Sequence, residues 1–191
     1  LDEVIPDNYK IRTYDRPTGY AAHTRIHFGG VCVPCLNDTG STCNLLPEEL
    51  ALLILNRAFD RVRADPKSQK KPNFPIAQLY KIRNAQSMKG AETTATMPLE
   101  YALLANVEFV PEGKTAGVCH RVYFKIVKKG TSGLKTAVFG WPLLDRPHNG
   151  SEGLHWQPQE DGYFYQKLGV TLPRCDLSAR NNYLQSSVTY K

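Results

Sequence analysis

Apolar and polar residues alternate along much of this chain, as they do in half-buried β-strands. Residues 120–127, His-Arg-Val-Tyr-Phe-Lys-Ile-Val, are the clearest case. Short apolar runs between Gly, Pro and polar clusters predict further strands at 21–28, 31–36, 80–82, 93–99, 101–109 and within 136–145. Gly29-Gly30 predicts a tight turn between the first two strands, and residues 84–91 predict a hairpin tip. Pro34 predicts an edge position or a local irregularity in its strand.

One segment has the period of a helix instead. Pro47 and two Glu residues open it and Arg residues close it, as helix ends favour. Pro66 follows the predicted end of this helix at residue 63. The residues expected on its inner face are Leu50, Leu53, Ile54, Arg57, Ala58, Arg61 and Val62. The pattern therefore predicts a mainly β fold with one substantial helix.

Length and composition indicate one globular domain with tails. The chain has 191 residues, of which 41% are hydrophobic and 22% charged. Residues 1–20 show no clear periodicity and are interpreted as an N-terminal arm. The longest apolar run, Leu50 to Leu55, is too short to cross a membrane, so we expect no membrane contact. The chain begins with Leu1 rather than Met, as a piece cut from a longer protein would.

The net charge is +6, and the densest basic stretch is residues 57–71, where Asp60 and Asp65 partly offset the basic residues. Such a stretch can make a weak contact with nucleic acid. The plainer interpretation is a solvated helix face followed by a loop, because a modest excess of charge mostly serves solubility. The basic residues of this stretch are Arg57, Arg61, Arg63, Lys67, Lys70 and Lys71.

Five cysteines make an odd number and are too sparse for a disulfide framework. They favour free thiols and a cytoplasmic or other intracellular location. Cys32 and Cys35 form a Cys-x-x-Cys pair, but a redox pair works at a helix N-terminus and these two lie on a predicted strand. A zinc site built from them with Cys119 and His120 lacks a second Cys-x-x-Cys. We therefore predict no metal and no cofactor.

The run Asp38-Thr-Gly-Ser-Thr lies between two apolar segments. A carboxylate in such a place is costly unless it is paired or hydrogen-bonded. Gly40 permits a tight turn, while Thr39 and Ser41 offer hydroxyls to nearby oxygens. Asp-Thr-Gly alone is more often an ordinary Asx-type turn. Here, however, it follows an apolar strand and is matched later by Ala-Val-Phe-Gly-Trp-Pro-Leu-Leu at 137–144.

Together these segments resemble the retropepsin-type aspartic proteases, the family of retroviral and retrotransposon proteases and their cellular relatives. In that family an apolar strand leads into Asp-Thr/Ser-Gly, and a later apolar-Gly segment with a short helix packs beneath the loop. The resemblance implies a protease domain at 21–155, a β half-barrel closed as a homodimer, with a C-terminal extension at 156–191. The predicted helix is longer than in viral members and is similar to the insertion of cellular ubiquitin-linked relatives.

The resemblance also assigns roles to residues. Asp38 would be catalytic, and Thr39 would bond across the dimer axis. Thr42 and Trp141 stand where many retroviral enzymes carry a paired Asp and Arg, which puts dimer stability and substrate anchoring in question. The remaining assignments are the active-site loop, Thr39, Gly40 and Ser41; the flap that closes over substrate, Ser87, Met88, Lys89 and Gly90; and the segment supporting the loop, Val138, Phe139 and Gly140.

The chemistry of this family needs two carboxylates that share one proton. This chain has one Asp-Thr/Ser-Gly, and Asp161-Gly162 lacks the middle residue. The second Asp38 must then come from another copy in a C2 homodimer, with 156–191 as candidate interface strands. We expect an aspartic endopeptidase that cleaves a protein or peptide substrate, as in polyprotein processing. The alternative is an inactive retropepsin-like module that binds protein, or nucleic acid through 57–71.

Overall fold

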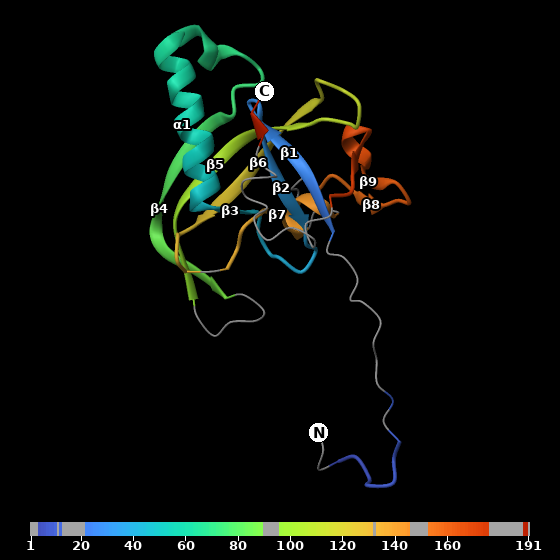
Figure 1. Ribbon diagram of the computed structural model, residues 1–191. Helices are drawn as coiled ribbons and strands as arrows, with labels where there is room; N and C mark the ends of the chain where they lie inside the picture. Colours follow the sequence, from blue (N-terminus) through green and yellow to red (C-terminus); the bar gives the residue numbers. More distant parts are fainter. Residues whose placement is uncertain are drawn as a thin grey trace.

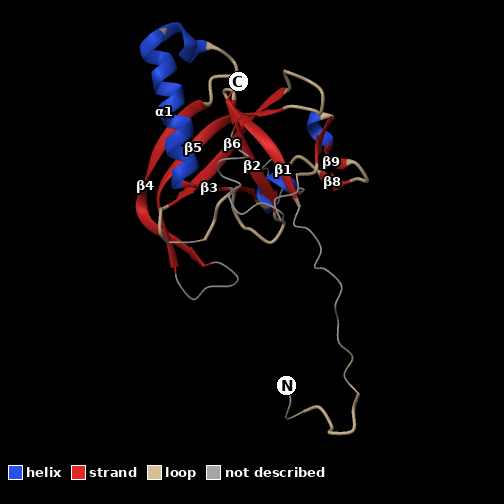
Figure 2. Ribbon diagram, viewed as in Figure 1, coloured by secondary structure: helices blue, strands red, loops and turns tan. Residues whose placement is uncertain are grey.

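The computed structural model describes residues 4–10, 12, 22–89, 96–131, 133–145, 153–175 and 189–190. Figures 1 and 2 show a body built mostly of strands with one long helix at its side, as the sequence predicts. The helices are α1 (Glu48–Ala64), α2 (Trp141–Leu144) and the 3-10 turns η1 (Pro66–Lys70) and η2 (Gln166–Leu168). The strands are β1 (His23–Phe28), β2 (Val31–Asn37), β3 (Leu45–Pro47), β4 (Ile76–Lys89), β5 (Thr96–Phe109), β6 (Val118–Val127), β7 (Ala137–Phe139), β8 (Trp156–Pro158), β9 (Gly162–Tyr165), β10 (Val170–Pro173) and β11 (Thr189–Tyr190).

The main sheet closes on itself. Its strand order is β1-β2-β7-β3-β6-β5-β4, and β1 also pairs with β5 at His27 and Glu108. The strands from β1 to β5 in this order therefore form a barrel-like ring around one hydrophobic core. Packed aromatic rings fill its centre, with Phe109 stacked on Phe139 at 5.7 Å between centroids. Such aromatic pairs contribute beyond the area that they bury.

Helix α1 confirms the one substantial helix predicted from the sequence, shifted by one residue. Pro47 is its N-cap, and two Glu residues lie in its first turn. Its buried face is narrower than predicted, because Arg57 and Arg61 are not part of it. Arg61 instead donates a hydrogen bond to the carbonyl of Gly29 at 2.9 Å, which ties the helix to the β1–β2 turn. The buried residues of α1 are Leu50, Ala51, Ile54 and Ala58.

Pro34 lies in β2, which is an inner strand rather than an edge strand. On one side Pro34 pairs with Arg25 of β1. On the other side β11 pairs with residues 31 and 32, and β7 pairs with residues 35–37. Pro34 falls between these two pairings, where no described strand needs its missing N–H. Pro34 thus lies at a gap in the pairing of an inner strand, rather than on the edge strand that was one of the two predictions.

The hairpin of β4 and β5 is longer than the sequence predicts. Residues 84–91 were expected to form its tip, but β4 continues to Lys89 and pairs there with Thr96. The connection between the strands lies at 90–95, outside the described residues. The two strands expected at 93–99 and 101–109 are one strand, β5, with a bulge between Leu99 and Tyr101. A bulge absorbs one extra residue without ending the ladder.

Beyond the ring, β8, β9 and β10 form a small antiparallel sheet. Its residues Tyr165 and Leu172 are fully buried and belong to the same core as the barrel. An interface role for 156–191 stays a prediction. Of the predicted arm at 1–20, the described residues 4–10 lie apart from the body in Figure 1. No helix in the described ranges is long and apolar enough to span a membrane.

Candidate active site

Asp38 directly follows β2, where the buried strand leaves the core. The backbone turns there, since the N–H of Ser41 donates to the carbonyl of Asp38 at 3.1 Å. The N–H of Gly40 donates to the Asp38 Oδ1 at 2.9 Å. Asp38 itself is half-buried, and Thr39 and Gly40 are exposed. The carboxylate is therefore held at the surface of the chain on a short, hydrogen-bonded loop.

This loop is joined to the later apolar-Gly segment. The parallel pairing of β2 with β7 sets Leu36 beside Val138 and Asn37 beside Phe139. The N–H of Asp38 then donates to the carbonyl of Phe139 at 2.9 Å. The two segments are far apart in sequence but share one ladder. The geometry thus brings Val138 and Phe139 to the loop that the sequence assigned them to support.

Gly140 continues this contact and has no room for a side chain. A Cβ at Gly140 would lie 2.4 Å from the carbonyl oxygen of Cys43 and 2.7 Å from that of Ser41. Trp141 follows at the start of α2, and its N–H donates to the same Ser41 carbonyl at 2.8 Å. Pro142 occupies the first turn of α2, where a proline is tolerated. The close approach explains why glycine stands here.

Two buried asparagines flank the acidic motif, and the sequence analysis missed both. Asn44 accepts from the N–H of Gly140 at 2.8 Å and donates to the carbonyl of Tyr123 at 3.1 Å. Asn37 accepts from the Tyr165 hydroxyl at 2.7 Å. An Asn next to an apolar strand is a signal that could have been used, because buried amides need partners. Nothing in the local sequence identifies Tyr165, which lies on β9.

A second apolar cluster lies between the loop and the β4–β5 hairpin. Met88 of β4 packs against it, and its Sδ lies 3.9 Å from the Cys43 Sγ. Burial raises the pKa of the Cys43 thiol, although the nearby Lys125 opposes the shift. A sulfur contact thus joins the hairpin to the residues that follow Ser41. The buried members of the cluster are Leu45, Met97, Leu99, Val127 and Val138.

The predicted flap residues lie on one arm of this hairpin. Ser87 pairs with Pro98 and Met88 with Met97, so both are part of the β4–β5 ladder. Ser87 and Lys89 are exposed, whereas Met88 is half-buried. Gly90 lies outside the described residues. The arm reaches the neighbourhood of the candidate site through Met88, and the flap role of these residues stays a prediction.

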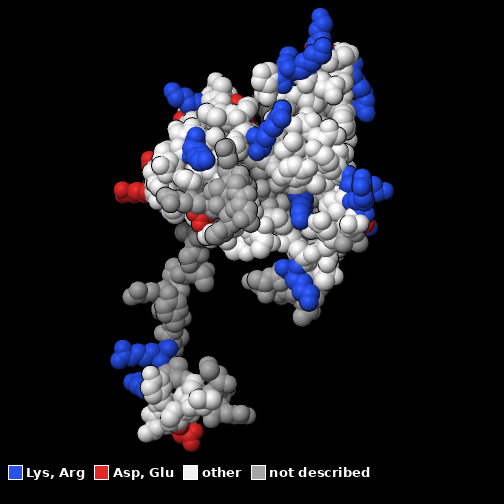
Figure 3. Space-filling model, turned by 180° about the vertical axis from the view of Figure 1, so that it is seen from behind, with Lys and Arg blue, Asp and Glu red and all other residues white. Residues whose placement is uncertain are grey.

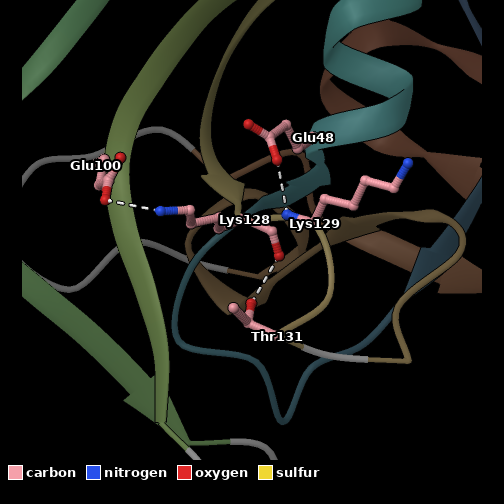
Figure 4. Close-up of polar contacts among 5 residues, drawn as sticks. All are labelled: Glu48, Glu100, Lys128, Lys129 and Thr131. Carbon is pink, nitrogen blue, oxygen red and sulfur yellow. Dashed lines mark hydrogen bonds and ion pairs between the residues drawn. The ribbon is translucent and has the colours of Figure 1, made fainter.

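The turn between β6 and β7 is fixed to the start of α1 (Figure 4). The Glu48 carboxylate accepts from the N–H of Lys129 at 2.7 Å, and Thr131 closes the turn onto the carbonyl of Lys128 at 2.7 Å. Lys128 also approaches Glu100 of β5 at 3.5 Å. The turn adjoins the apolar cluster, since Leu134 packs against it. These contacts hold the turn to the start of the helix and leave it next to the apolar cluster.

The described residues include no group of three His, Cys, Asp or Glu side chains that could hold a metal ion. All five cysteines are free of disulfides, and Cys32 and Cys35 are both buried. The basic stretch 57–71 runs along the second half of α1 and through η1. An intracellular location and a nucleic-acid contact stay predictions.

Comparison with solved structures bears on the fold. The retroviral protease-like domain of Ddi1 from Leishmania major matches at 11% identity and a TM-score of 0.52, over 85% of this chain and 100% of that one. The EIAV protease, solved with the inhibitor HBY-793, matches at 12% identity and a TM-score of 0.35, over 68% of this chain and 88% of its own. No family model and no curated protein matches the sequence. On the likeness to the Ddi1 domain, this chain has a retropepsin-like fold, the fold of aspartic proteases.

Proposed function

We propose that this chain is an aspartic endopeptidase that acts as a homodimer. The observation that carries the proposal is the loop of Asp38. The carboxylate leaves a buried strand, and the loop is clamped by hydrogen bonds from Asp38 to Phe139 and from Trp141 to Ser41. Such rigidity suits catalysis, because a catalytic group must be held in its productive geometry before the reaction starts.

In the proposed reaction, a water molecule lies between Asp38 and the Asp38 of a second copy. Two like charges so close cannot both ionise, so the pair holds one proton. The ionised carboxylate takes a proton from the water as its oxygen attacks the scissile carbonyl carbon. The protonated carboxylate gives its proton to the carbonyl oxygen. The tetrahedral intermediate then collapses as the carboxyl group that took the water's proton gives it to the leaving amine. A hydroxyl of the intermediate returns a proton to the other carboxylate as it becomes the product carboxyl group, which restores the shared-proton pair.

The substrate would be an extended peptide lying between the β4–β5 hairpin and the loop. Strand edges bind such peptides through main-chain hydrogen bonds, and pockets for alternate side chains give specificity. The apolar cluster that includes Val138, with Met88 packed against it, favours apolar side chains next to the scissile bond. This arrangement supports a peptide substrate and makes no use of a cofactor.

The test is cleavage of a peptide library by the chain and by Asp38→Asn, between about pH 4 and 7, where a shared-proton pair works. We expect Asp38→Asn and a pepstatin-like inhibitor to abolish cleavage. Asp161→Asn is the matched control, because Asp161 is an exposed acid that precedes a glycine outside the Asp38 loop, and this variant should cleave normally. A well-folded dimer that cleaves no peptide would reject the proposal in favour of an inactive binding module.

A further inference from the structure

The outer face of the β4–β5–β6 sheet carries side chains that the proposed protease reaction does not use. On β6, Val122 and Phe124 point into the core and are 1% and 0% exposed, so Arg121 and Tyr123 point outward. On β4, Tyr80 pairs with Ala102, next to the buried Leu103, and so shares this outer face. Tyr80, Arg121 and Tyr123 therefore lie together on the outside of the sheet.

Tyr80 and Tyr123 form an exposed aromatic pair across β5. Their ring centroids lie 5.4 Å apart with an interplanar angle of 26°, so the rings are stacked. Tyr80 is 40% exposed and Tyr123 is 49% exposed. Stacked rings at the surface offer an outer π-face to a further flat group. Nucleic-acid bases bind to such faces irrespective of their sequence.

A basic cavity of about 530 Å³ begins at Arg121, two residues along β6 from Tyr123. Lys70 and Lys71 line it from η1 and the loop after it, and Arg121 lines it from β6. Arg121 thus belongs both to the cavity and to the outer face that carries Tyr123. Amide groups of Gln69 and Asn106 add hydrogen-bonding capacity to the same walls. Cations and amides are the groups that contact phosphate and sugar.

Among the residues that the structure describes, no ion pair neutralises the lysine and arginine charges of this cavity. In the described ranges, neither Lys70, Lys71 nor Arg121 takes part in one. Glu108 lies further along β5 on the same face, and its carboxylate accepts from the N–H of Gly117 at 3.0 Å. Figure 3 views the molecule from behind and shows mostly lysine and arginine among the charged side chains on the half that carries α1 and β4. The field there favours an anion.

We propose that these five residues, Tyr80, Tyr123, Lys70, Lys71 and Arg121, form a binding face for single-stranded nucleic acid. The cations hold phosphates, and a base stacks on the tyrosine pair. A duplex keeps its bases stacked on one another and offers none to the rings. An acidic peptide would contact the cations but would place no flat group on the tyrosine rings. Within the basic stretch 57–71, the proposed contact uses Lys70 and Lys71. Arg61 and Arg63 are already engaged, because Arg61 is hydrogen-bonded to Gly29 and Arg63 to Asp60.

The test is fluorescence anisotropy with labelled oligo(dT) and oligo(U) of about 12 nucleotides, a length within the range of single-strand binding sites. Three phosphate contacts give a slope of about −2 for log affinity against log salt, at about −0.7 each. A duplex of the same length and polyglutamate serve as competitors. Equal competition by either would overturn the proposal, as would the absence of oligonucleotide binding at about 50 mM salt.

Variants separate stacking from charge. Tyr123→Ala should weaken binding about tenfold, whereas Tyr123→Phe should keep it, since the ring does the stacking. Tyr80→Ala provides a second stacking variant if the first fails to fold. Lys71→Ala should lower both the affinity and the salt slope. Lys167→Ala, an exposed lysine on η2, removes the same charge elsewhere. An equal loss from Lys167→Ala, or none from either tyrosine variant, would refute the assignment.

Discussion

The hydroxyl of Tyr165 is fully buried and donates to the Oδ1 of Asn37, the residue before Asp38. Tyr165→Phe removes the donor and leaves a buried amide oxygen without that partner. Such a loss costs about 1–3 kcal/mol. We expect the free energy of unfolding, measured in urea, to fall by that amount. Tyr101→Phe is the control, because Tyr101 is 41% exposed, and should change little. Equal effects of the two variants would contradict a structural role for the bond.

The thiol of Cys35 gives the fold a pH dependence in alkali. Burial raises its pKa well above the ordinary value of 9.0. A backbone hydrogen bond from Phe139 lowers the pKa, but by less than burial raises it. The unfolded chain loses this proton near the ordinary value, and the folded chain keeps it. The folded state therefore binds more protons at high pH, so stability is unaffected below that value and falls as the pH rises above it.

This behaviour can be isolated with a variant. Urea unfolding between about pH 7 and 10 should show a decline of at most about 1.4 kcal/mol per pH unit from this one group. Cys35→Ala should flatten the alkaline part of the curve, whatever it costs in stability at neutral pH. Cys119→Ala, which removes an exposed thiol, should flatten it far less. Parallel curves for wild type and Cys35→Ala would show that the thiol does not carry the effect.

At the residue scale, local sequence was enough to find Asp38 and not enough to find what holds it. The acid is recognisable in the sequence because it lies between two apolar segments. The residues that hold the Asp38 loop are not recognisable from local sequence. The hydrogen bond from Tyr165 to Asn37 spans 128 positions, and the one from Gly140 to Asn44 spans 96. Such contacts depend on the ladder between β2 and β7, which no local pattern encodes.

At the scale of elements, α1 and the turn after β6 are joined by Glu48. Its carboxylate sits in the first turn of the helix and accepts from the N–H of Lys129, so both the helix dipole and a charged hydrogen bond favour it. Glu48→Ala should cost about 1–2 kcal/mol of unfolding free energy. Glu100→Ala breaks the exposed pair with Lys128 and should cost at most about 0.5 kcal/mol. The measurement is urea unfolding of both variants. A larger loss of unfolding free energy in Glu100→Ala than in Glu48→Ala would refute this account.

Elements with a strong local period were predictable, and those set by pairing were not. The helix after Pro47 was found to within one residue, because capping and periodicity agree there. The hairpin tip was misplaced, since the residues at 86–89 resemble a turn in composition but are held as strand by the partner residues at 96–99. Packing of Met88 against the apolar cluster adds to that pairing. Tertiary contacts thus override local turn preference.

At the scale of the whole molecule, one chain forms a closed ring with the Asp38 loop at its surface. The half-buried carboxylate of Asp38 has a hydrogen bond from Gly40 within its own loop. The proposed reaction needs a second carboxylate, and a two-fold axis beside this loop would supply an identical one. Dimerisation would then complete the site as well as bury the exposed Thr39.

This arrangement predicts how inactive subunits affect active ones. Mixing the chain with an equal amount of Asp38→Asn, at concentrations where dimers dominate, should leave about one quarter of the dimers with two acids. Peptide cleavage per wild-type chain should therefore fall to about half, and with a threefold excess of Asp38→Asn to about one quarter. The same excess of an unrelated protein controls for crowding and adsorption. If each chain carried a complete site of its own, the added variant would leave cleavage unchanged, and the shared site would have to be abandoned.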